Sequence, residues 1–131
     1  MAGIKLDGTG QVKMATLEEA MTAAQALNAQ AERFGVAVKG NAKNNATYIS
    51  SYKRIATPLV GKLKGQFGLI SDLVSTSILT ISRPGGGDVI KLRVMREAVA
   101  QLKVQIEIAI SQTKAKHAKH EDGGGGAPGD G

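Results

Sequence analysis

The feature that most constrains the fold is a run of six residues that neither a helix nor a strand can cross. Arg83-Pro84-Gly85-Gly86-Gly87-Asp88 joins a proline to three consecutive glycines. Proline removes a backbone donor, and glycine readily adopts the left-handed conformations of tight turns. A long apolar repeat lies on each side of this run, and the two repeats share one spacing. The sequence therefore predicts a turn that folds one long helix back on another.

The repeat before the turn extends from Val60 to Ile81, with steps that alternate between three and four residues. This heptad spacing is typical of packed helices, and we expect a helix over 46–81. Pro58 interrupts that helix, because proline lacks an N–H and disfavours a helical conformation in the residue before it. A break or a sharp kink is therefore expected at Pro58.

Three glycines share one flank of this expected helix. They are Gly61, Gly65 and Gly68. Each costs about 1 kcal/mol relative to alanine in a helix interior. Close approach by a neighbouring helix would explain all three, and we favour that interpretation over flexibility or contact with a ligand.

The repeat after the turn predicts a second long helix, over 89–116. Asp88 is a suitable N-cap, and the apolar residues from Leu92 to Ala109 continue the heptad spacing. A shorter helix is predicted earlier in the chain, over 17–34. There Thr16 and Glu19 have the spacing of a capping box, and Gly35 follows at the position of a C-cap glycine.

We therefore predict an all-α protein in which the first helix joins a long antiparallel helical hairpin, as a bundle or a coiled-coil assembly. An α+β alternative remains open, because the β-branched runs Ser77–Ile81 and Val89–Val94 flank a Pro-Gly turn and would also suit a short β-hairpin at about 77–94. The length of the second heptad repeat favours the helical interpretation.

The 131 residues are enough for one domain. We expect a flexible N-terminal arm over 1–15, a helical domain over 16–118 and a disordered, Gly-rich acidic tail over 119–131. The start of the chain has no apolar segment of a secretory signal, and no stretch is long enough to span a bilayer. A cytoplasmic protein is expected, and export without a signal stays open.

No residues with a catalytic arrangement can be recognised. The chain has no cysteine, and its two histidines, His117 and His120, lie beside Glu121 and Asp122 near the end of the chain. Such a group can bind a divalent ion weakly, but a solvated terminus offers no pocket that would shift a pKa. We therefore predict no enzyme activity, no metal, no cofactor and no small-molecule substrate.

Basic residues are concentrated in the expected hairpin. Residues 41–86 carry six bases and one acid, and residues 87–120 carry seven bases and three acids. Eight of these bases are candidates for binding anions. They are Lys53, Arg54, Lys62, Lys64, Arg83, Lys91, Arg93 and Arg96. Contacts of this kind with phosphates would be independent of sequence and sensitive to salt.

The apolar residues of the second long helix exceed one heptad seam. Ile90, Val94, Val104, Ile108 and Ile110 widen it, and a helix that is apolar over so much of its circumference must be covered on several sides. We therefore predict a homo-oligomer, or a complex with a helical protein partner. The residues assigned to this contact are Val60, Leu63, Phe67, Ile70, Val74, Leu92, Met95, Val99, Leu102 and Ile106.

The function expected from these features is that of a structural or interaction protein, a self-associating component of a filament, capsid, secretion apparatus or similar assembly. A basic nucleic-acid-associated protein is the first alternative. A membrane-surface protein is the second, because residues 59–81 are amphipathic and their lysines lie at one end.

Overall fold

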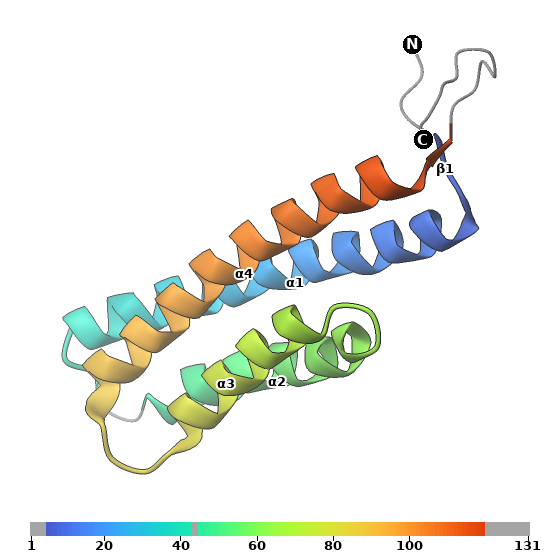
Figure 1. The fold of residues 1–131 in the computed structure, drawn as a ribbon. Helices are drawn as coiled ribbons and strands as arrows, with labels where there is room; N and C mark the ends of the chain where they lie inside the picture. The colour runs from blue at the N-terminus through green and yellow to red at the C-terminus, as the bar shows by residue number, and fades with distance from the viewer. Residues whose placement is uncertain (1–4, 43–44, 120–131) are drawn as a thin grey trace.

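The computed structural model describes residues 5–42 and 45–119, and this part of the chain forms four helices that run up, down, up and down (Figure 1). The helices are α1 (Gly8–Lys39), α2 (Ala46–Lys64), α3 (Gly68–Ser82) and α4 (Gly87–His117). Two short strands, β1 (Lys5–Leu6) and β2 (Ala118–Lys119), pair antiparallel beside the outer ends of α1 and α4.

The long helices α1 and α4 pack along each other, and α2 and α3 form a shorter hairpin that packs on both of them. With 32 and 31 residues, α1 and α4 extend past the hairpin, whose helices have 19 and 15 residues. The all-α class and the helical bundle are confirmed. The alternative β-hairpin at 77–94 is wrong, because residues 77–82 and 87–94 are helical.

The expected helix over 46–81 is two helices, and its break lies beyond Pro58. Pro58 is an exposed residue inside α2, and the chain reverses at 65–67 instead. Phe67 leaves the helical conformation there, with φ −133° and ψ 61°. Helix-like hydrogen bonds continue around the turn, from Phe67 N to the Leu63 carbonyl at 2.7 Å and from Ser71 N to the Phe67 carbonyl at 2.9 Å. Because these hydrogen bonds keep a helix-like rise through the turn, the apolar residues on both sides of it still face the core.

The glycine run is a pivot, as expected, but it joins the short helix α3 to α4. Gly85, Gly86 and Gly87 all have positive φ, between 69° and 82°, which strains any residue with a side chain. Gly86 is the N-cap of α4, in place of the predicted Asp88. The Asp88 carboxylate instead accepts a 2.8 Å hydrogen bond from the side-chain amide of buried Asn45, which ties the α1–α2 loop to the start of α4.

Helix α1 is longer at both ends than the predicted 17–34. Asp7 caps it, by accepting a 2.7 Å hydrogen bond from Gly10 N, so residues 8–15 are helical rather than an arm. The predicted cap Thr16 lies inside the helix, where its hydroxyl bonds to the Val12 carbonyl at 3.2 Å. Gly35 does not end the helix. It gives room to the Arg96 guanidinium, which a Cβ would meet.

In α1, glycine permits the close approach of a neighbouring helix. At Gly61, Gly65 and Gly68 no neighbour comes close. An added Cβ at any of these three would meet nothing within 4 Å, so the expectation of a tightly packed neighbour there is wrong. Gly65 and Gly68 instead bracket the reversal between α2 and α3.

Buried hydroxyl groups hold α2 against α3. The Ser77 hydroxyl donates its one proton to the Val74 carbonyl at 2.7 Å, so the Tyr52 hydroxyl, 2.8 Å away, is the donor to Ser77 Oγ. Burial raises the pKa of Tyr52 above its ordinary value of 10.0, and Ser77 lowers it by less, because the Ser77 hydroxyl can turn to donate to the phenolate once Tyr52 ionises. This contact joins α2 to α3 within the core.

Candidate interaction surface

The ten residues that the sequence assigns to self-association lie within the fold of one chain. Eight are buried in its core, and Val60 and Phe67 are partly buried and pack against that core. Those from α4, together with Ala109, form the inner seam: Leu92, Met95, Val99, Leu102, Ile106 and Ala109. Because the inner seam packs on helices of its own chain, other residues must form the apolar surface that a partner can reach.

A second seam with the same spacing lies on the outside of α4. It consists of Ile90, Val94, Glu97, Gln101, Val104 and Ile108, in steps of four and three, and is called the outer seam. Ile90 is 51% exposed, Val104 47% and Ile108 44%. Four of the five residues that widen the predicted helix belong to it. The fifth, Ile110, packs against the core, and Val94 of the outer seam is also partly buried against it.

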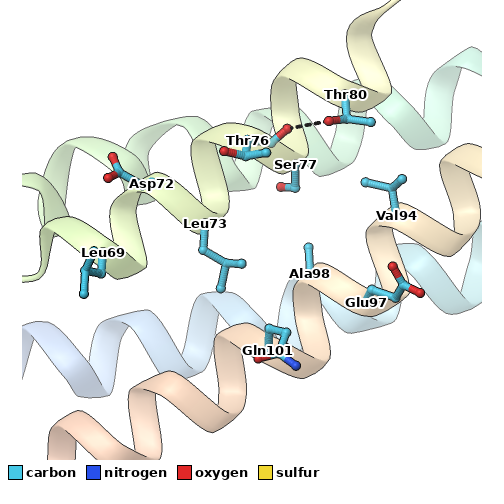
Figure 2. A pocket seen from close by; sticks show the side chains of 10 residues that line it. All are labelled: Leu69, Asp72, Leu73, Thr76, Ser77, Thr80, Val94, Glu97, Ala98 and Gln101. Carbon is cyan, nitrogen blue, oxygen red and sulfur yellow. Dashed lines mark hydrogen bonds between the residues drawn. The ribbon is translucent and has the colours of Figure 1, made fainter.

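A groove of about 510 Å³ between α3 and α4 runs beside the outer seam (Figure 2). Its walls are Leu69, Asp72, Leu73, Thr76, Ser77, Thr80, Val94, Glu97, Ala98 and Gln101. Leu73 points across the groove toward α4, where Ala98 leaves room for it. Asp72 and Glu97 are acidic, and of the described residues that line the groove none is basic.

The groove continues toward the turn between α2 and α3. A second hollow of about 230 Å³ shares Leu69 with the first, and Phe67, Gln105 and Ile108 are among its lining residues. Leu69 is 87% exposed. The two hollows together make an apolar surface along most of the contact between α3 and α4. Sequence reasoning missed it, because the surface exists only once the expected helix 46–81 is folded in two.

The eight candidate anion-binding residues are not gathered into one patch. Lys62 and Lys64 lie in the last turn of α2, whereas Arg83 and the bases of α4 lie at the opposite end of the bundle. Within the described part of the chain, two of the eight have carboxylate partners: Lys62 lies 3.2 Å from Glu19, and Arg96 lies 3.9 Å from Glu32.

His117, the last residue of α4, contacts the start of α1. Its Nδ1 is 3.2 Å from the Asp7 carboxylate, and its Nε2 is 3.5 Å from Lys13 Nζ. Gly10 makes this possible, since a Cβ there would come within 2.5 Å of His117 Cβ. Among residues 5–42 and 45–119, no group of three or more potential ligands could hold a metal ion. His120, Glu121, Asp122 and the Gly-rich tail lie outside the described residues.

Within the described helices, none is both long enough and apolar enough to cross a bilayer. Comparison of the chain with protein-family models, with curated proteins and with solved structures finds no match in any of the three. The surface between α3 and α4 must therefore be interpreted from its own chemistry.

Proposed function

We propose that this protein is a non-enzymatic structural or interaction protein that self-associates through the outer faces of α3 and α4, as a component of a larger assembly. The observation that carries the proposal is the groove between these helices, with the outer seam beside it. Contiguous apolar surface of this kind marks sites of interaction on soluble domains.

The free energy available from covering this surface is substantial. Leu69 is 87% exposed, Val104 47% and Ile108 44%. Burying a fully exposed side chain of this kind stabilises by about 1.5–3 kcal/mol, and covering these three gains a share of that in proportion to their exposed area. The charges of the groove limit the choice of partner. Because Asp72 and Glu97 are the charged groups among its described lining residues, the groove disfavours polyanions.

Sedimentation of the full chain over a range of concentrations tests the proposal. We expect a mass that rises with concentration, and a double variant, Val104→Glu with Ile108→Glu, that stays monomeric. Val36→Glu is the matched control, since Val36 on α1 is 73% exposed and lies outside the groove and the outer seam. A wild-type chain that stays monomeric at all concentrations would overturn self-association.

The net charge of +6 favours nucleic acid as a second candidate partner. Arg83 and Arg93 are exposed near the turn between α3 and α4, and neither has an ion-pair partner among the described residues. Binding to duplex DNA should then weaken steeply with salt, and Arg83→Gln with Arg93→Gln should reduce the slope. Anionic vesicles in the same assay test the membrane-surface alternative. Binding to neither leaves self-association as the function.

A further inference from the structure

The outer seam is symmetric about its own midpoint. Counted from position 99, Ile90 mirrors Ile108, Val94 mirrors Val104, and Glu97 mirrors Gln101. The positions of the inner seam are also mirrored, about 100.5, but its mirrored residues differ in size, as Leu92 and Ala109 do. In a two-fold interface a residue that contacts a given position of the second copy is contacted by that same position in return. Mirrored residues of matching size and polarity therefore suit such an interface.

We infer that two copies of this chain pair through α4 in antiparallel orientation, with the two-fold axis at the level of position 99. The inference rests on the proposed self-association and specifies its geometry. Ile90 of each copy packs against Ile108 of the other, and Val94 packs against Val104. These are the alternating layers of an antiparallel coiled coil, in which a residue of one heptad position faces the other heptad position of its partner.

The polar residues at the centre of the seam select this orientation. In the antiparallel pair, the Glu97 carboxylate of one copy faces the Gln101 amide of the other and accepts a charge-assisted hydrogen bond from it. A parallel pair in register would place Glu97 against Glu97, where like charges repel. A parallel pair shifted by one heptad would bury Glu97 of one copy against Val104 of the other, without a hydrogen-bond donor. Polar residues at seam positions specify register in this way.

A flanking pair of charges agrees with the same register. Arg93 and Glu107 lie on the same edge of the outer seam, both are exposed, and neither has an ion-pair partner among the described residues. Residues on the same edge meet across an antiparallel pair. Arg93 mirrors position 105, so it lies about 3 Å along the axis from Glu107 of the second copy, at 1.5 Å per residue.

The groove between α3 and α4 enlarges the contact beyond one helix. Leu69 and Leu73 of α3 border the groove into which the seam of the second copy would lean. One helix–helix contact alone buries less than the roughly 800 Å² per partner of a standard specific interface. Leu69 and Leu73 add apolar surface to the contact on the side of α4 that faces α3.

Site-specific crosslinking tests the orientation, and the absence of cysteine makes the design simple. Two single variants, Ile90→Cys and Ile108→Cys, are purified and treated with a short bismaleimide, separately and mixed. Ile90 and Ile108 are about 27 Å apart along α4, at 1.5 Å per residue. Antiparallel pairing therefore predicts a crosslinked dimer only in the mixture. Val36→Cys, on α1, serves as the control for random collisions.

The outcomes separate the inference from the proposed function. Crosslinking of either single variant by itself would indicate a parallel pair and overturn the inference, while self-association would stand. The same division follows if sedimentation shows a dimer but the mixture is not crosslinked, since another face would then hold the copies together. A monomer that never crosslinks would overturn both.

Discussion

Helix α4 carries two seams of the same heptad spacing, and only the inner seam is buried along its whole length inside the chain. The inner seam is apolar at every position and is buried in the core, where α4 packs on α1 and α3. The outer seam has the same number of members, but Glu97 and Gln101 occupy its middle and its isoleucines are about half exposed. The spacing of apolar residues therefore indicates a packed helix face without showing what packs on it.

The difference lies in what each seam must achieve. An apolar seam gains stability at each layer, and in the inner seam the connections to the neighbouring helices fix the register. Two separate chains have no such connection. A polar layer must then specify orientation, at a cost in affinity. We expect the inner seam to determine the fold and the outer seam to determine a reversible contact.

Leu102→Ala and Val104→Ala should separate the two seams most clearly. Leu102 is buried, and its truncation should reduce the free energy of unfolding by about 2–5 kcal/mol. Val104→Ala, two residues away, should change the unfolding of the monomer by less than about 0.5 kcal/mol while weakening association. Urea denaturation followed by circular dichroism at low concentration measures the first effect. Equal losses in the two variants would contradict the distinction.

The double variant Glu97→Leu with Gln101→Leu should strengthen the outer seam and make it less selective. Replacing both polar partners leaves no carboxylate without a donor and adds apolar contact, so we expect the dimer dissociation constant to fall about tenfold, which corresponds to 1.4 kcal/mol. When combined with Ile90→Cys, the double variant should also begin to form crosslinks by itself, because the register loses its polar contact. Sedimentation gives the affinity. An unchanged or weaker affinity would mean that positions 97 and 101 lie outside the contact.

Tyr52→Phe should act on the fold and leave the outer seam alone. The lost hydrogen bond to Ser77 should reduce stability by about 1 kcal/mol at neutral pH. Because burial raises the pKa of Tyr52, its contribution is complete below pH 10 and declines as the pH rises through the folded-state value. Denaturation at a series of alkaline pH values should show a shallower decline in Tyr52→Phe than in the wild type, with half-buried Tyr48→Phe as control.

Gly61→Ala should have the smallest effect, and a favourable one. An added Cβ at Gly61 meets nothing within 4 Å, so the better helix propensity should add up to about 1 kcal/mol without changing association. Gly10→Ala is the opposite case, since its Cβ would collide with His117, and it should destabilise the protein. Thermal unfolding of both variants gives the comparison. A loss of stability in Gly61→Ala would show that this face of α2 is covered.

The sequence predicted the helical class, the turn at 83–88 and the position of α4 to within two residues, because heptad spacing and glycine conformation are local properties. The reversal at 65–67 could not be recognised from spacing, since Phe67 keeps its place in the apolar repeat while its backbone turns. Gly65 and Gly68 indicated the reversal, but the unbroken apolar spacing across them favoured one continuous helix.

The early start of α1 was missed for a different reason. Residues 8–15 form a helix because they pack beside the end of α4. Only a glycine at position 10 leaves room for His117, which is more than a hundred positions away in the chain. The groove between α3 and α4 depends in the same way on which helices become neighbours. Local patterns contain no information about such distant contacts.

The pairing of β1 with β2 has a consequence for how copies could be strung together. Lys5 and Lys119 lie opposite each other in that pairing, so the chain enters and leaves the helical bundle at the same end. A short linker between β1 and β2 would therefore allow a circular permutant whose new termini lie in the turn at 65–67. In the antiparallel pair these ends of the two copies point in opposite directions. A fused cargo would then appear at both tips of a rod, whichever terminus carried it.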